Sequence, residues 1–334
     1  MKRISGVVLA VVLLLSLCSA CAKAPATDQV QAPATLVVRA TDGASAPPGS
    51  GLASNPGSAT TPSLSSPPRT TASVRPSRPT VRTPGGMWWG VDSSGPMNDD
   101  ALAAVQAWYR GVRPQVWGRY LNGSYAVTAQ ELAWARRHGI YVDLLVPDDN
   151  CSQCAGGGDL CGGDRTIQQA MTDADAAVDA AQRLKIPAGA RIFKDLEQVA
   201  ACHGEPTAAY VRGWYTTVRK SPYLVGLYGN STTPEYAFPR AYCEVLAGNR
   251  NFAKDVALDA TEPEPELGKP RNASGPGNAP LYRPDVPPCA PAGSTVIWQY
   301  GESVDRDNYA DIDEVNPRTA GLLAPDGGVT VGPR

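Results

Sequence analysis

Residues 115–147, QVWGRYLNGSYAVTAQELAWARRHGIYVDLLVP, carry a complete strand–helix–strand pattern. Gln115–Leu121 and Ile140–Pro147 predict buried strands, and Thr128–His138 predicts a helix that Gly139 ends. Two strands separated by one helix indicate a parallel pair joined by a crossover.

The same alternation continues on both sides of this unit. Before it, Met87–Ser93 predicts a strand and Asn98–Arg110 a helix with Asn98 as its N-cap. After it we predict helices over Asp164–Leu184, Pro206–Lys220 and Pro234–Ala247, and strands over Arg191–Glu197, Tyr223–Tyr228, Asp255–Ala260 and Thr295–Tyr300. Residues 261–293 are rich in Pro and Gly and predict an irregular insertion. The fold class is therefore α/β, a TIM-like (β/α) barrel whose late strands are irregular or missing.

The barrel follows a segment of different composition. Every Trp, Tyr and Phe lies at or after Trp88, whereas residues 22–85 are rich in Pro, Ser, Thr, Ala and Gly. Such a segment buries too little apolar surface to offset its ordering entropy. We predict a disordered linker over 21–85, a barrel over 86–323 and a tail over 324–334. The linker is weakly basic. We expect it to act either as a spacer through the cell envelope or as a segment that binds anionic wall polymer electrostatically.

The N-terminus reads as an export signal. A basic start, Met1-Lys2-Arg3, precedes an apolar run that ends in small residues, so we predict a signal peptide over 1–20. Ser19-Ala20-Cys21 is typical of the end of a bacterial lipobox, in which the Cys is lipidated. The expected location is extracytoplasmic, with the protein either lipid-anchored at Cys21 or cleaved and secreted to the cell envelope.

Composition excludes several classes of function. The 334 residues include 30 Lys+Arg and 32 Asp+Glu, a balance that provides no basic field for nucleic acid. Only two histidines are present, His138 and His203, which argues against a Ser-His-Asp triad or a His-rich metal site. Carboxylates are the expected catalytic tools. We expect no metal and no cofactor.

Eight cysteines are present in the chain. With Cys18 removed and Cys21 lipidated, six remain in an exported domain, so we expect three disulfides rather than a zinc site. The three cysteines Cys151, Cys154 and Cys161 lie in one loop, and either Cys154 or Cys161 is expected to pair with Cys202.

Acidic residues cluster where predicted strands end, which is where parallel barrels place their chemistry. Strand Met87–Ser93 contains Asp92, and Asp311 and Asp313 follow the last clear strand. Asp195 and Glu197 are two residues apart, so a strand directs both to one face. Two close acids raise the pKa of one of them, and glycosidic bond cleavage requires a protonated acid beside an ionised one.

These motifs, in this order, resemble the glycoside hydrolase family 25 lysozymes. The closer resemblance is to the glycoside-hydrolase-like domain once catalogued as domain of unknown function 1906, found in exported actinobacterial proteins. The motifs are Gly90-Val-Asp-Ser-Ser94, Trp117-Gly-Arg-Tyr-Leu121, Asp195-Leu-Glu197, Gly226-Leu-Tyr-Gly229, Trp298-Gln-Tyr300 and Asp311-Ile-Asp313. The resemblance covers about 86 to 318 and implies a (β/α) barrel that acts on or binds a cell-wall glycan.

The resemblance also implies roles for the acids. Glu197 would be the proton donor, and Asp195 would position the substrate or serve as base. Asp92 and Asp311 would complete the acidic ring, with Asp313 as the other match for the last position. A solvated acidic turn is the alternative for Asp311 and Asp313.

Five further residues are candidates for substrate binding: Arg119, Tyr228, Trp298, Tyr300 and Asp313. Arg119 would hold a carboxylate of the ring by a charge-assisted bond. Trp298, Tyr300 and Tyr228 would either stack on a sugar or belong to the core. Asp143 is either a structural partner of Arg119 or a member of the site. Lys194 departs from the lysozyme pattern, which usually has an apolar residue facing the helix layer at this position. Either its side chain extends past that layer so that the amine reaches a polar environment, or the strand ends early.

Three functions agree with this pattern. The first is an enzyme, a lysozyme-like O-glycosyl hydrolase that cuts peptidoglycan-type glycan. The second is a glycan-binding or regulatory lipoprotein with a retained acidic cleft, and the third is a scaffold in the wall, since one fold carries unrelated functions. The expected partners are cell-wall polysaccharide and, through the lipid anchor, a membrane. We expect a monomer that binds no nucleic acid.

Overall fold

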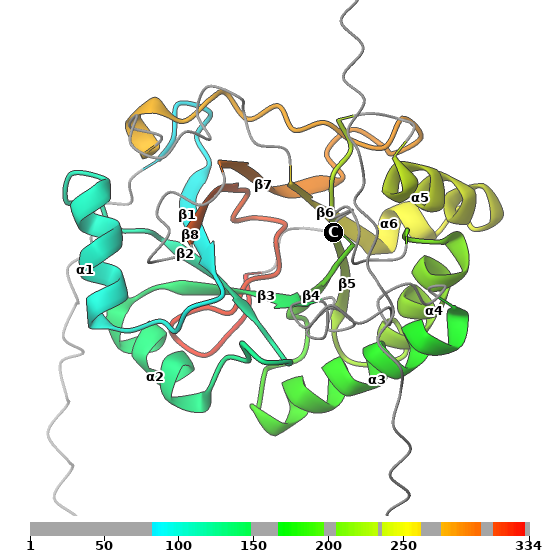
Figure 1. Cartoon of the computed structure of the whole chain (residues 1–334), viewed down its shortest axis with the longest axis horizontal. Helices are drawn as coiled ribbons and strands as arrows, with labels where there is room; N and C mark the ends of the chain where they lie inside the picture. The colour runs from blue at the N-terminus through cyan, green and yellow to red at the C-terminus, as the bar shows by residue number, and fades with distance from the viewer. Residues whose placement is uncertain are drawn as a thin grey trace, which may run out of the picture. The chain divides into compact units, whose positions relative to one another are not determined.

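Eight β-strands form the centre of the described structure, and helices surround them (Figure 1). The computed structural model describes residues 82–147, 166–196, 205–232, 236–261, 275–301 and 310–330. The strands are β1 (Trp88–Ser93), β2 (Val116–Tyr120), β3 (Tyr141–Val146), β4 (Arg191–Asp195), β5 (Leu224–Gly229), β6 (Val256–Thr261), β7 (Thr295–Gly301) and β8 (Ala310–Val315). Several predicted features lie outside the described residues: the signal peptide, Cys21, the linker up to residue 81, Glu197, Cys151, Cys154, Cys161 and Cys202.

The strands close into a barrel in the order of the sequence, β1 to β8. Neighbours from β1 to β7 are parallel, whereas β8 is antiparallel to both β7 and β1. The predicted (β/α) barrel is therefore confirmed, and its irregularity lies at its end. A strand antiparallel to its neighbour needs no crossover helix to reach its place in the sheet.

Strand β8 was not predicted, and the alternative of a solvated acidic turn is wrong. Asp313 is only 4% exposed, and β8 pairs with β1 along its whole length. The first four residues of its sequence, Ala-Asp-Ile-Asp, alternate apolar and acidic residues with the period of a strand. A sequence pattern normally identifies the buried face of a strand by its apolar residues. In β8 the aspartates face the inside of the barrel instead.

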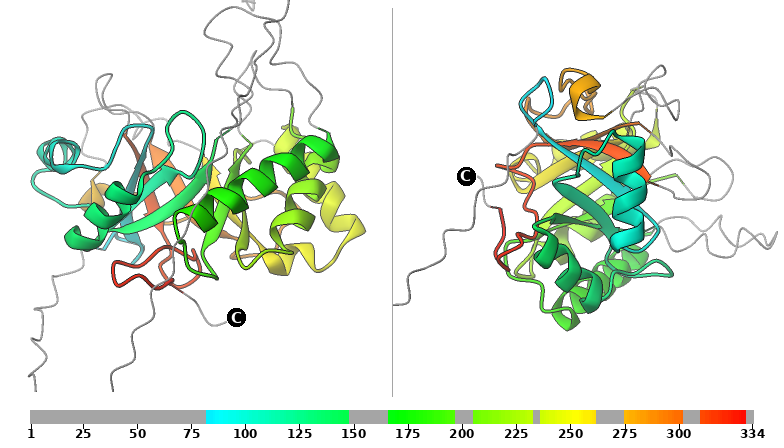
Figure 2. Two further views of the ribbon diagram at one scale, coloured as in Figure 1. Left: turned by 90° about the horizontal axis from the view of Figure 1, so that it is seen from below. Right: turned by 90° about the vertical axis from the view of Figure 1, so that its left-hand side faces the viewer.

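Helices cover the outside of the barrel. They are α1 (Asp99–Trp108), α2 (Ala129–His138), α3 (Ile167–Arg183), α4 (Ala208–Val218), α5 (Ala237–Gly248) and the short α6 (Phe252–Asp255). The predicted caps are present: the Asn98 side chain accepts from Ala101 N, and Gly139 ends α2 in the left-handed region with φ 67°. Figure 2 shows α3 and α4 side by side, with the buried alanines of α3 allowing close approach.

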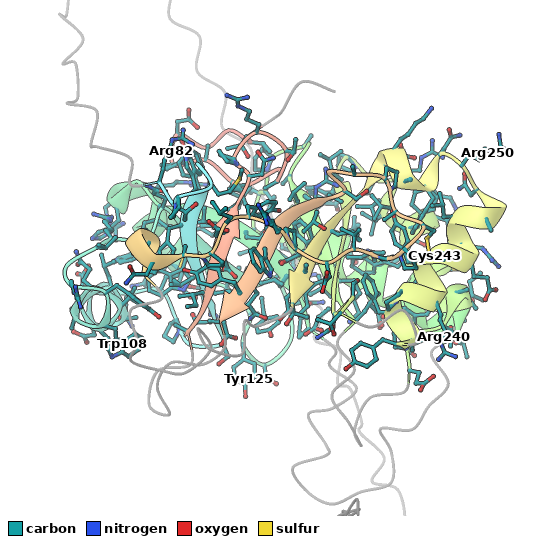
Figure 3. All side chains as sticks on the ribbon, turned by 90° about the horizontal axis from the view of Figure 1, so that it is seen from above. Arg82, Trp108, Tyr125, Arg240, Cys243 and Arg250 are labelled. Atoms are coloured by element: carbon teal, nitrogen blue, oxygen red, sulfur yellow. A yellow bond between two sulfur atoms is a disulfide. The ribbon has the colours of Figure 1, made fainter. Side chains whose placement is uncertain are left out.

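The chain between β6 and β7 is irregular where it is described. Residues 275–294 hold one short 3₁₀-helix, η4 (Pro276–Asn278), as the Pro- and Gly-rich composition predicted. A disulfide between Cys243 and Cys289 ties this connection to α5, as the yellow bond in Figure 3 shows. One of the three expected disulfides is therefore present. The other four cysteines of the exported domain lie outside the described residues.

The segment after β8 lies across the amino ends of β3 and β4 (Figure 1). Val142 and Leu323 exchange two backbone hydrogen bonds, and Arg191 N donates to Gly321 O over 3.0 Å. Hydrogen bonds continue past the predicted barrel end at Leu323 as far as Thr330, whose N donates to Leu322 O.

Two apolar layers hold the barrel together. The outer layer lies between strands and helices and contains Trp89, Trp117 and Trp214. The inner layer fills the amino end of the barrel with Val116, Phe193 and other side chains. Across the described ranges, no helix has both the length and the apolar character that membrane crossing requires.

Candidate functional site

Aspartates line the inside of the barrel. Because side chains alternate along a strand, the buried Val116, Phe193 and Val315 of the inner layer identify the inward positions. Every second residue of a strand, and its register partners on the neighbouring strands, point to the same side. By this rule six aspartates face inward: Asp92, Asp143, Asp195, Asp259, Asp311 and Asp313. The described interior is thus strongly acidic toward the carboxyl ends of the parallel strands.

The reversed direction of β8 brings two of the predicted acids together. Asp92 lies near the end of β1 and is in register with Asp311, near the start of β8. On the other side of β1, Gly118 faces Asp92, and a Cβ atom at Gly118 would lie 2.5 Å from the Cβ of Asp92. Gly118 therefore provides the space that the Asp92 side chain occupies.

An amide fixes the Asp92 carboxylate in place. Gln299 Nε2 donates to Asp92 Oδ2 over 3.2 Å. The carbonyl oxygen of the same side chain accepts from Tyr228 OH at 2.7 Å and from Thr261 Oγ1 at 2.6 Å. Gln299 is 2% exposed, so these bonds form away from water and define which end of the amide faces Asp92.

Asp313 lies deeper and carries a strongly perturbed pKa. Burial raises the pKa of Asp313 well above its usual value, the nearby Asp259, Asp311 and Asp143 raise it further, and a side-chain hydrogen bond with Asp92 opposes the rise. The Asp92 and Asp313 carboxyl groups are therefore close neighbours, and burial favours the protonated form of Asp313.

Asp195 faces the same interior from the opposite wall of the barrel. It is 8% exposed and in register with Tyr228 of β5, whose hydroxyl bonds Gln299. Glu197, the predicted proton donor, lies outside the described residues. Lys194, which precedes Asp195, points outward, and its Nζ donates to Pro147 O over 2.6 Å, so its amine is held at a carbonyl.

The structure does not bring Arg119, Trp298 and Tyr300 into this site. All three point outward from the barrel and are 2%, 2% and 0% exposed. Tyr300 OH accepts from Trp89 Nε1 at 3.0 Å in the outer core. Strand parity explains the correction: in Trp-Gln-Tyr the central Gln299 is the residue that faces inward.

Arg119 pairs with a helix rather than with the acidic ring. It forms a buried ion pair with Glu131 of α2 at 3.1 Å. Asp143 points the other way, into the barrel, so the predicted pairing of Arg119 with Asp143 is wrong. Its nearby cation is Arg191: burial raises the pKa of Asp143 to about 7, and Arg191 opposes the rise.

Sequence reasoning missed three members of the interior: Asp259, Thr261 and Gln299. The alternation of β6, Val-Ala-Leu-Asp-Ala-Thr, contains the signal, because Asp259 and Thr261 share one face. Within the described part of the chain, no three His, Cys, Asp or Glu side chains are arranged to hold a metal ion.

Fold and acids together define a glycoside-hydrolase-like (β/α) barrel. Residues 106–263 match the model of the family described as the Rv2525c-like, glycoside hydrolase-like domain, in agreement with the resemblance that the sequence motifs indicated.

Several solved structures are similar to this chain. An uncharacterized protein of B. stearothermophilus is 26% identical, with a TM-score of 0.57 over 70% of this chain and 99% of that one. The Tat-secreted protein Rv2525c of Mycobacterium tuberculosis, in complex with L-tartrate, is 11% identical over 73% and 100% of the chains, with a TM-score of 0.41. The modular autolysin LytC of Streptococcus pneumoniae, in complex with synthetic peptidoglycan ligand, is 13% identical over 68% and 46%, with a TM-score of 0.38. No curated protein matches the chain.

Proposed function

We propose that this protein is an exported glycoside hydrolase that cleaves a peptidoglycan-type glycan of the cell envelope by carboxylate acid–base catalysis. One observation carries the proposal: inward aspartates of β1, β4 and β8 gather in one barrel, and burial raises the pKa of one of them, Asp313, well above its usual value. Glycoside hydrolysis uses two carboxyl groups in different protonation states. Barrels of this class place their catalytic groups at the carboxyl ends of the strands.

The reaction assigns a role to each acid. Glu197 donates a proton to the glycosidic oxygen, the bond from that oxygen to the anomeric carbon breaks, and the leaving sugar gains a hydroxyl. Water then adds its oxygen to the anomeric carbon and returns a proton to the acids, which creates a new reducing end. Asp195 positions the substrate or serves as base. Asp92, which Gln299 holds by a hydrogen bond, and Asp311 stabilise the positive charge of the oxocarbenium-like transition state.

The cellular setting is part of the same proposal. The signal peptide, Cys21 and the linker support a monomeric barrel tethered to the outer face of a membrane, where its substrate would be cell-wall polysaccharide. A linker of this composition spans distance without folding, so the barrel would reach glycan away from the lipid surface.

Mass spectrometry of released fragments tests the activity. The purified full chain is incubated with peptidoglycan and with N-acetylglucosamine oligomers, beside Glu197→Gln and Asp92→Asn variants. Glu244→Gln is the matched control, because Glu244 is an exposed acid on α5. We expect new reducing ends from the unchanged chain and from the control, and a loss of about 100-fold or more in Glu197→Gln. Equal release by Glu197→Gln would refute its role as proton donor.

One observation favours glycan binding without turnover as a second function. Asp92 already bonds both Gln299 and Asp313, an arrangement that suits holding a sugar hydroxyl as well as catalysis. Saturable binding of the oligomers without fragment release would assign this function instead.

A further inference from the structure

The loop between β2 and α2 presents an aromatic ring to solvent. Tyr125 is 56% exposed, more than any other large apolar side chain among the described residues. Its ring lies against that of Tyr120, with centroids 6.3 Å apart and planes inclined by 41°. Tyr120 is the last residue of β2 and is half-buried, so the two rings form a pair at the rim of the barrel.

The backbone under Tyr125 is fixed by a buried cation. Arg119 Nη2 donates to Tyr125 O over 3.1 Å, and Arg119 Nη1 donates to Ser93 O over 2.5 Å. Its third contact is the ion pair with Glu131. Glu131 in turn accepts from Met97 N and Thr128 N at 3.0 and 2.9 Å, so one ion pair joins the loops that follow β1 and β2.

The same arginine links the loop of Tyr125 to the end of β1, which carries Asp92. Ser93, which Arg119 holds, directly follows Asp92, and Tyr120 lies two residues beyond Gly118, the register partner of Asp92. Tyr120 therefore faces inward, one inward position above the carboxylate. Figure 3 shows Tyr125 at the edge of the barrel opposite to the segment after β8, which covers the amino ends of the strands.

A single exposed aromatic residue needs no explanation, but an aromatic pair beside an acidic interior, with its loop backbone bonded by Arg119, does. Fixing the loop backbone under Tyr125 lowers the ordering cost that a ligand would otherwise pay on binding. The ligand that suits an exposed aromatic pair is a ring with an apolar face. The neighbouring aspartates repel an anionic ligand and leave an uncharged one.

We propose that Tyr120 and Tyr125 form a stacking subsite for an uncharged pyranose of the β-linked N-acetylhexosamine type. In such a sugar the substituents are equatorial, so one face consists of C–H groups that pack on an aromatic ring. The subsite rests on the proposed function, because it binds the glycan whose scissile bond lies over Asp92. The Arg119–Glu131 pair is its support and does not contact the sugar.

Titration with the hexamer of N-acetylglucosamine tests the subsite. Binding is measured by calorimetry in a Glu197→Gln full chain, so that the probe is not consumed. Into this background we introduce Tyr125→Ala, Tyr125→Phe and, as matched control, Tyr236→Ala, since Tyr236 is an exposed tyrosine that follows β5. We expect Tyr125→Ala to weaken binding about tenfold, a loss of about 1.4 kcal/mol, and the other two to bind within about twofold of the background.

Each outcome decides a different question. Unchanged binding in Tyr125→Ala would overturn the subsite, while cleavage by the unsubstituted chain would leave the proposed function standing. An equal loss in Tyr236→Ala would also overturn it, because the effect would not belong to the supported pair. Absence of both binding and cleavage in every chain would overturn the proposed function and the subsite with it. Because the Tyr125 ring is mostly exposed, the unfolding temperature should be unchanged in Tyr125→Ala.

Discussion

Gln299 organises the interior because its two ends carry opposite hydrogen-bonding roles. Its carbonyl oxygen accepts from two hydroxyl groups, and its amide nitrogen donates to the Asp92 carboxylate. Turning the amide over would place its oxygen against that of Asp92, which is unfavourable while Asp92 is ionised. The hydroxyl groups of Tyr228 and Thr261 therefore fix the amide so that its nitrogen faces Asp92.

Replacing Gln299 by Leu should destabilise the fold. The change leaves the hydroxyls of Tyr228 and Thr261 without this acceptor and Asp92 without this donor. We expect the free energy of unfolding to fall by about 1–3 kcal/mol, measured by urea denaturation. Gln168→Leu, at an exposed position of α3, is the control and should stay within about 0.5 kcal/mol. A Gln299→Leu chain as stable as the control would show that the network contributes little.

Asp143 makes stability depend on pH in a defined direction. Its pKa is about 7 in the folded chain, whereas an unfolded aspartate has a pKa of about 3.9. Between these values the folded state holds a proton that the unfolded state has lost, so stability decreases as pH rises through this window. Burial raises the pKa of Glu314, also to about 7, and therefore acts with the same sign.

Removing this acid should flatten the pH profile. In Asp143→Asn, the loss of stability between about pH 4 and pH 7 should be shallower by up to about 1.4 kcal/mol per pH unit. The measurement is the urea midpoint across that range. Asp179→Asn, an exposed position on α3, should keep the original slope. Parallel profiles for Asp143→Asn and the unchanged chain would place the folded pKa of Asp143 near its ordinary value.

Among the elements, those with apolar alternation or clear caps could be predicted from the sequence. Strands β1 to β7 and helices α1 to α5 lie within a few residues of their predicted bounds. Strand β8 could not be predicted, because its inward face is acidic and only the closed ring shows that this face is buried. The directions of Trp298 and Tyr300 depended on strand parity, and a shift of one residue moves a side chain to the other face. Arg119 was misplaced for the same reason.

Helix α2 depends on its first turn, where Glu131 has two roles. It completes a capping box with Thr128 and neutralises the buried Arg119. Glu131→Ala would leave a buried guanidinium without its carboxylate, so we expect a loss of about 3–5 kcal/mol in the free energy of unfolding. Gln130→Ala, exposed on the same turn, tests whether any change in this helix has that effect. Similar stabilities of the two variants in urea would show that the ion pair is weak.

At the scale of the whole molecule, the barrel has one acidic and one apolar half. Toward the carboxyl ends of the parallel strands the interior holds aspartates and Gln299, and toward the amino ends it holds Val116, Phe193 and Val315. Ala320 and Leu322, from the segment after β8, close the apolar half and are 0% and 1% exposed. The apolar half can thus supply the stability that the mutually repelling acids of the other half reduce.

Removing the closing segment should therefore unfold the barrel. A chain that stops after Asn316 loses Leu322 and Leu323, each of which contributes about 1.5–3 kcal/mol by burial, and the two backbone bonds to Val142. A domain has only about 5–15 kcal/mol of net stability, so this loss removes much of it and opens the apolar half to water. A chain that stops after Thr330 keeps all of these contacts and is the control. Circular dichroism during urea denaturation should show an early or absent transition for the shorter chain alone. Coincident transitions would mean that the strands close the barrel without the segment, and the acidic half would then need another source of stability.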